Sequence, residues 1–142
     1  MGMMISPMMQ LQAQEVNKDD ILGIWFNQEK DTIMVYKKDT IFLGKIVALE
    51  IPNDSTGKPR TDIKNPKPDL KKRKLKGLTF LEGCEFDHGE WKGCDFYDYT
   101  IGKRYPCKMK LMKFQDPTED TLNIINLAGE RTTYWTKKKP SN

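Results

Sequence analysis

Hydrophobic and polar residues alternate with a period of two along most of the chain. The clearest run is Arg104–Phe114, in which Met109 and Leu111 fall on one face and Lys108 and Lys110 on the other. Successive side chains of a β-strand point to opposite faces of a sheet, so this period predicts strands. The pattern predicts eight strands, at residues 21–27, 32–38, 41–51, 77–87, 90–99, 104–114, 121–127 and 131–137.

Tight turns separate most of these runs. Asp87-His88-Gly89-Glu90 is typical of a hairpin turn, with Gly where a positive φ is needed. Consecutive strands joined in this way predict an all-β fold, an up-and-down antiparallel β-barrel of about eight strands, since closure removes the exposed sheet edges. A β-sandwich is the alternative. A barrel of about eight strands has an interior that side chains fill or that holds one small ligand.

One connection departs from this pattern. Residues 52–74 contain four of the eight prolines and form a long irregular loop rich in Pro and Lys. A short helix is expected at Pro68–Arg73, with Pro in its first turn, and one helical turn between Val16 and Leu22. We therefore expect a single barrel domain over residues 17–137, followed by a disordered tail at residues 138–142.

The 142 residues carry a formal net charge of +4 that is unevenly spread. Residues 58–76 hold nine Lys or Arg against two Asp, whereas residues 79–100 hold six acids against one Lys. A basic loop beside an acidic hairpin can pair with it or steer a partner. Nucleic acid is not an expected partner, because no aromatic residues interleave the basic stretch to stack on bases.

The amino terminus, residues 1–16, resembles the end of a secretory signal peptide, and the alternative is a disordered extension. Residues 1–16 contain a short apolar stretch that ends in Leu11-Gln12-Ala13 before Gln14, where a signal peptidase could cut. The longest uncharged run is the first fourteen residues, too short for a transmembrane helix. We expect an exported protein, periplasmic or secreted, with no transmembrane segment.

Three cysteines and one histidine limit the chemistry that the chain can perform. Cys84 and Cys94 fall on opposite sides of the hairpin centred on Gly89, where they form a disulfide or pack as free thiols. The cysteines form no CxxC pair, so neither a metal site nor another cofactor is expected. His88 lies in a turn with no nucleophile in a predictable geometry, and we therefore expect no enzymatic activity.

Gly23-Ile24-Trp25 opens the first predicted strand after the helical turn. This segment resembles the Gly-x-Trp signature of the lipocalin and calycin barrels, in which the Trp plugs the closed end. The resemblance implies that a basic residue of the last strand packs over this Trp, and Arg131 occupies the corresponding position. Trp25 and Arg131 are then expected to staple the first strand to the last, through a cation–π contact of roughly 0.5–2 kcal/mol.

A second resemblance covers nearly the whole chain. It is carried by Ile21-Leu22-Gly23-Ile24-Trp25, Gly44-Lys45-Ile46-Val47, Gly57-Lys58-Pro59, Asp62 with Asn65-Pro66, Gly77-Leu78, Gly89-Glu90-Trp91, Tyr97-Asp98, Gly102-Lys103 with Tyr105 and Cys107, and Gly129 with Arg131-Thr132 and Trp135. The order and spacing of these pieces resemble the bacterial family called domain of unknown function 2147. Membership implies an exported lipocalin-like barrel and no particular activity.

The chain departs from that family at two positions. Leu43 stands where members often have Cys, so a bridge from that position to Cys107 is not expected here. Tyr99 stands where members tend to have Pro.

Two functions fit these observations. In the first, the barrel binds a small apolar or amphipathic ligand, with lining residues expected among Phe42, Trp91, Phe96, Tyr97 and Tyr134. The same aromatic residues fit a barrel whose interior is simply filled. In the second, the protein acts at the cell envelope, where the basic loop at residues 58–76 contacts an acidic partner or an anionic lipid surface.

Overall fold

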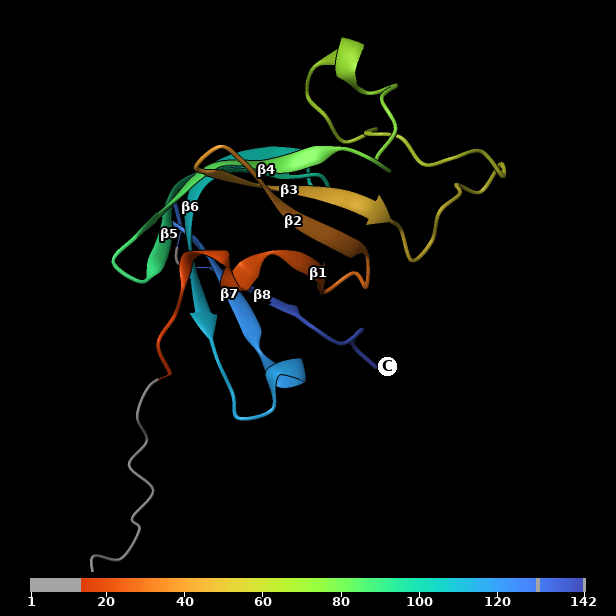
Figure 1. The fold of residues 1–142 in the computed structure, drawn as a ribbon. Helices are drawn as coiled ribbons and strands as arrows, with labels where there is room; N and C mark the ends of the chain where they lie inside the picture. The colour runs from red at the N-terminus through yellow and green to blue at the C-terminus, as the bar shows by residue number, and fades with distance from the viewer. Residues whose placement is uncertain (1–13, 130, 142) are drawn as a thin grey trace, which may run out of the picture.

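The computed structural model describes residues 14–129 and 131–141. Eight antiparallel strands follow one another around a closed barrel, each paired with its neighbours in sequence (Figure 1). The strands are β1 (Gly23–Phe26), β2 (Thr32–Lys38), β3 (Ile41–Ala48), β4 (Thr79–Asp87), β5 (Glu90–Asp98), β6 (Lys103–Met112), β7 (Thr121–Asn126) and β8 (Thr132–Thr136). The predicted up-and-down barrel of eight strands is confirmed, and the sandwich alternative is wrong.

The barrel closes through a short contact between its first and last strands. A single residue pair, Phe26 with Thr136, joins β1 to β8, whereas β7 and β8 share five pairs. Because all neighbouring strands are antiparallel, the connections β1–β2, β3–β4, β5–β6 and β7–β8 lie at one end of the barrel. We call this end the mouth.

A 3₁₀ helix, η1 (Lys18–Ile21), lies at the end opposite the mouth. Ile21 is fully buried, and its carbonyl accepts a hydrogen bond from Trp25 Nε1 at 2.8 Å. Trp91 Nε1 donates to the carbonyl of Lys18 at 3.2 Å. The two indole N–H groups therefore fasten η1 across this end, and the predicted helical turn is present.

Aromatic side chains fill the barrel interior. Trp25, Trp91 and Trp135 are all at most 1% exposed. Phe80 packs edge-to-face against Phe96 and Trp135, with ring centroids 5.4 and 5.7 Å apart. Edge-to-face packing is favourable for aromatic rings, so these contacts give a dense core between the strands.

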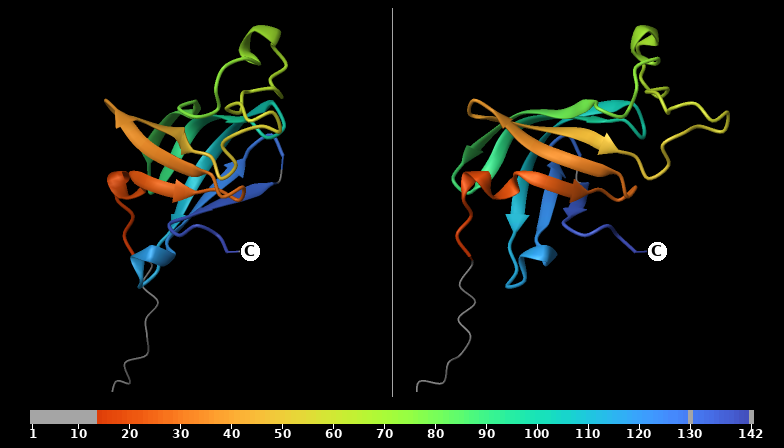
Figure 2. Two further views of the ribbon diagram at one scale, coloured as in Figure 1. Left: turned by 90° about the vertical axis from the view of Figure 1, so that its right-hand side faces the viewer. Right: turned by 45° about the vertical axis from the view of Figure 1, so that its right-hand side comes forward.

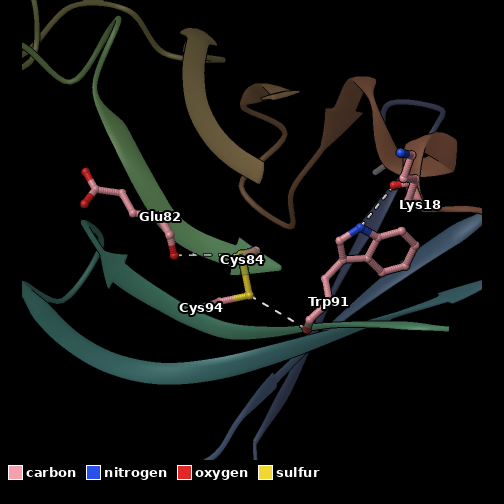
Figure 3. The surroundings of a disulfide bond; sticks show 5 residues. All are labelled: Lys18, Glu82, Cys84, Trp91 and Cys94. Atoms are coloured by element: carbon pink, nitrogen blue, oxygen red, sulfur yellow. Dashed lines mark hydrogen bonds between the residues drawn. A yellow bond between two sulfur atoms is a disulfide. The ribbon is translucent and has the colours of Figure 1, made fainter. Parts of the chain in front are cut away.

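A disulfide joins Cys84 of β4 to Cys94 of β5, with Cα atoms 4.3 Å apart (Figure 3). Gly83 and Gly93, beside the two cysteines, have positive φ values of 75° and 73°, and the strand pairing skips this point while keeping the same register on both sides. The structure thus contains the bond that the hairpin allowed. Cys107, opposite Cys94 in the register, remains a buried thiol, and burial raises its pKa to about 12.

The long connection between β3 and β4 extends away from the barrel at the mouth (Figures 1 and 2). It contains the short 3₁₀ helix η2 (Pro68–Leu70), where a helix was expected, and an isolated bridge between Thr61 and Lys74. The remaining 3₁₀ helix, η3 (Pro117–Glu119), lies between β6 and β7. None of the helices in the described part of the chain is long and apolar enough to cross a membrane.

The sequence predicts a signal remnant at the amino terminus and a disordered tail at the carboxyl terminus. The proposed signal remnant falls mainly on residues 1–13, which lie outside the described residues. The predicted disordered tail has no regular secondary structure at residues 138–141, but it contacts the barrel. Lys138 pairs with Glu119 at 2.9 Å, and Lys139 pairs with Glu50.

Candidate ligand-binding site

Three of the five aromatic residues expected to line a ligand cavity lie inside the barrel. Phe42 and Trp91 are 1% and 0% exposed and contact each other edge-to-face, with ring centroids 6.4 Å apart. Phe96 stacks on Tyr105 at 5.0 Å. These rings pack against other core side chains and fill the interior, although Phe42 also lines a separate hollow together with Lys37 and Phe86.

The other two candidates lie on different surfaces. Tyr97 is 3% exposed because the long β3–β4 connection covers it, and its hydroxyl donates to Asp62 at 2.7 Å. Tyr134 lies on the outside of β8 and is 47% exposed. The five residues therefore do not converge on one cavity.

A cavity of about 660 Å³ lies at the mouth, between the barrel and the β3–β4 connection. This size is within the range of ligand pockets in proteins. We call it the mouth cavity. Its apolar lining includes Ile51, Ile63 and Leu75, and its polar lining includes Asp31, Tyr99 and Thr100. Ile51 and Ile63 are each 65% exposed, which is unusual for such large apolar side chains.

Asp31 is the most deeply buried carboxylate of this lining, at 2% exposure. It accepts hydrogen bonds from the Tyr99 hydroxyl at 2.7 Å and from the Glu50 backbone N–H at 2.9 Å. Asn27 Nδ2 donates to the same Tyr99 hydroxyl at 2.7 Å. We call these side chains, Asn27, Asp31 and Tyr99, the Asp31 network. Burial, reinforced by the charge of Asp31, raises the pKa of Tyr99, which keeps its hydroxyl a donor.

The mouth cavity is negative on the side of the barrel. Partial desolvation raises the pKa of Glu29, and the charges of Asp98 and Asp31 act in the same direction. The cationic side chains of the lining, Arg60 and Lys64, come from the β3–β4 connection. Arg60 already donates to the Ile51 carbonyl at 3.1 Å. The lining thus combines four carboxylates, those of Glu29, Asp31, Glu50 and Asp54, with apolar side chains and the two cations.

A second buried carboxylate fixes the β3–β4 connection to the barrel. Asp62, whose side chain is fully buried, accepts hydrogen bonds from Arg73 Nε and Asn65 Nδ2, each at 2.9 Å, and from Tyr97. The Arg73 guanidinium also lies over the Tyr97 ring at 5.4 Å from its centroid. We call these four residues the Asp62 anchor. It holds the outer wall of the mouth cavity in place.

Glycine at position 102 allows the connection to approach the β5–β6 turn. A Cβ added to Gly102 would collide with the carbonyl of Lys64, and its φ of 70° also favours glycine. The turn and the connection are therefore in direct backbone contact beside the anchor.

The expected staple between Trp25 and Arg131 is wrong. Lys137 Nζ lies 3.8 Å from the centroid of the Trp25 ring, while Arg131 is exposed and lines a different hollow together with Glu29 and Tyr105. The register explains the difference: Phe26 pairs with Thr136, which brings Lys137 beside Trp25 and leaves Arg131 several residues away. A basic residue of the last segment does cover the Trp, six positions later than expected.

The residues of the Asp31 network were missed as site residues, and the sequence carried only weak signals for them. Tyr99 stood out as a departure from the family pattern, but nothing local connects it to Asp31, 68 residues away. The Asp62 anchor had a stronger signal, since Asp62, Asn65 and Tyr97 all belong to the segments that carry the family resemblance. Within residues 14–129 and 131–141 no group of three His, Cys, Asp or Glu side chains is arranged to hold a metal.

Comparison with known proteins agrees with this architecture. Protein HP1028 from Helicobacter pylori, described as belonging to the lipocalin family, has a similar structure with a TM-score of 0.65 and 18% sequence identity. The similarity covers 89% of this chain and 85% of the other, and it shows a shared lipocalin-like fold. No curated protein matches the chain in sequence. The sequence profile of the family described as "Uncharacterized protein conserved in bacteria (DUF2147)" matches residues 23–137, and the chain belongs to this family.

Proposed function

We propose that the protein binds a small amphipathic ligand in the mouth cavity. The observation that carries the proposal is a cavity of about 660 Å³ whose lining combines exposed isoleucines with a buried polar network. A side chain as apolar as Ile gains by leaving water, so Ile51 and Ile63 favour an apolar chain between them. Because side chains fill the barrel interior, the ligand is expected to bind at the mouth.

A fluorescent apolar amine, N-phenyl-1-naphthylamine, tests this proposal directly. Its emission rises when it leaves water, so the protein is expected to enhance it in a saturable titration. Ile63→Asp is expected to weaken binding at least fivefold. Leu127→Asp is the matched control, since Leu127 is 55% exposed and lies outside the cavity. Absence of saturable enhancement, or equal weakening by both variants, would contradict the proposal.

We propose further that the protein is exported. The Cys84–Cys94 disulfide supports this, because such bonds persist mainly in oxidising compartments. Expression of the full chain in a bacterium, followed by fractionation and mass measurement, tests it. The mature protein is expected in the periplasm or medium with Gln14 as its first residue. Recovery of the uncleaved chain in the cytoplasm would contradict export.

A specific observation also favours the second function, contact with an acidic partner or an anionic lipid surface. Three acids of β4 and β5 pair with cations of β5 and β6: Asp87 with Lys92, Glu90 with Lys108 and Lys110, and Asp95 with Arg104. In the described chain they form no ion pair with residues 58–76, whose one internal ion pair is Arg73 with Asp62. The basic loop therefore keeps its charge facing solvent, where such a partner would bind.

Co-sedimentation with vesicles tests this second function. The protein is expected to bind phosphatidylglycerol vesicles and not phosphatidylcholine vesicles, with binding lost at high salt because exposed charges are screened. Four Ser substitutions in the basic loop, which spare the Asp62 anchor, are expected to abolish binding: Lys67, Lys72, Lys74 and Lys76. A control removes the same charge from other exposed lysines: Lys38, Lys92, Lys103 and Lys110. Equal loss in both variants would show that net charge, and not the loop, is responsible.

A further inference from the structure

The two buried carboxylates beside the β3–β4 connection have different partners. Asp62 has a cation, since Arg73 Nε lies 2.9 Å from Oδ2. Asp31 has only neutral donors, the Tyr99 hydroxyl and the Glu50 backbone N–H. Among the ion pairs of the described residues none includes Asp31.

A buried carboxylate without a cation is uncommon, because removing a charge from water is costly unless an opposite charge compensates. Asp31 borders the mouth cavity, so the cavity is the side from which a cation can reach it. Glu29 and Tyr99 line the same part of the cavity. A positively charged group placed there would lie beside the buried carboxylate of Asp31 and the exposed carboxylate of Glu29.

The walls of the cavity define the rest of the ligand. Ile51, Ile63 and Leu75 present carbon atoms on the side of the β3–β4 connection, with Leu75 only 3% exposed. The cavity therefore offers a ligand both carboxylates and apolar side chains. This arrangement matches a molecule with a compact cationic head and an aliphatic chain.

On these grounds we infer that the ligand of the mouth cavity is a cationic amphiphile, a primary amine carried on an aliphatic chain, with its ammonium group against Asp31 and Glu29. This inference rests on the proposed ligand-binding function and names its ligand class. The ammonium supplies the opposite charge that Asp31 lacks among the described residues. Arg60 and Lys64, which lie on the outer side, would then face the aliphatic part of the ligand or solvent.

Three ligands of equal chain length test the inference: dodecylamine, dodecanoate and dodecanol. Each competes with N-phenyl-1-naphthylamine at pH 7, where the amine is protonated and the acid ionised. Dodecylamine is expected to displace the probe at a concentration at least tenfold lower than dodecanoate, with dodecanol between them. Asp31→Asn is expected to weaken dodecylamine at least fivefold and leave dodecanol unchanged. Asp95→Asn, a carboxylate outside the cavity, is the control and should change neither.

The outcomes separate the two proposals. If the probe binds and dodecanoate competes as well as dodecylamine or better, the cationic head is wrong while the ligand-binding function stands. If Asp31→Asn weakens all three ligands equally, Asp31 supports the cavity wall and does not contact the ammonium, which also overturns the inference. If the probe itself gives no saturable binding, the proposed function fails.

Discussion

The Asp62 anchor and the Asp31 network place a carboxylate, a tyrosine hydroxyl and an amide side chain in similar surroundings, but they differ in charge. Asp62 is neutralised by Arg73 from the same connection, and its hydroxyl partner Tyr97 lies under that guanidinium. Asp31 meets neutral donors and borders a cavity. The first arrangement is complete within the chain, which is typical of a structural element.

This difference in charge indicates that the two networks have different roles. The hydrogen bonds of the anchor hold the long β3–β4 connection against Tyr97 of β5. The Asp31 network fixes the β1–β2 turn against the end of β5 and borders the mouth cavity. A filled barrel can therefore have a cavity at its mouth without an open interior.

The largest expected effect comes from Asp62→Asn. The substitution leaves Arg73 partly buried without its counter-charge, and breaking such a pair costs about 3 kcal/mol of the free energy of unfolding. Urea denaturation followed by tryptophan fluorescence measures the change. Asp87→Asn, which removes a solvent-exposed partner of Lys92, is the control and should leave the unfolding midpoint unchanged. A midpoint for Asp62→Asn equal to wild type would mean that the anchor does not stabilise the fold.

Asp31→Asn is expected to cost less, about 1 kcal/mol, because no cation is stranded and the amide keeps one oxygen as acceptor. The same urea titration compares the two variants directly. The contrast between the networks would be lost if Asp31→Asn destabilised the protein as much as Asp62→Asn. The double variant tests independence, since sites without shared partners give additive changes.

Alkaline pH should weaken the anchor through Tyr97. Burial, with the hydrogen bond to Asp62, raises the pKa of Tyr97 to about 12, against about 10 in an unfolded chain. The unfolded state therefore loses this proton first, so the stabilisation is complete below pH 10 and declines as pH rises toward 12. Unfolding titrations across this window measure the decline. Tyr97→Phe should show a shallower decline than wild type, and Tyr134→Phe, on the outer surface, should not.

The smallest expected change in stability comes from the cation–π contact over Trp25, which belongs to neither network. Lys137→Ala removes one cation–π contact and should cost about 0.5–1 kcal/mol, while Arg131→Ala should leave stability unchanged. Thermal unfolding of the two variants decides between them. A larger loss for Arg131→Ala would restore the contact first expected from the sequence.

The strands could be predicted because alternation is a local property of the chain. Gly89 marked the β4–β5 hairpin, and that hairpin brought Cys84 and Cys94 within reach. The contact over Trp25 depends on how far β8 is shifted along β1, which no local pattern encodes. The residue that covers Trp25 is therefore Lys137, six positions after the predicted Arg131.

The candidate site could not be predicted either, because it also depends on contacts between distant parts of the chain. The mouth cavity joins a turn near residue 30, a connection near residue 60 and a turn near residue 100, which meet only in the closed barrel. Aromatic residues are typical of ligand sites and were therefore predicted to line one, yet Trp91 and Phe96 fill the core. Isoleucines in an irregular loop, such as Ile63, belong to no alternating pattern of hydrophobic and polar residues, so nothing in the sequence marked them as lining a cavity.

The single residue pair between β1 and β8 also bears on how the chain folds. Every other strand pairing joins neighbours in sequence, whereas Phe26 and Thr136 are separated by most of the domain. Local contacts form quickly and distant ones slowly, since closing a long loop costs entropy before any contact repays it. Hairpins such as β4–β5 should therefore form early, and the seam between the first and last strands should close late and exchange its amide hydrogens before the rest of the barrel.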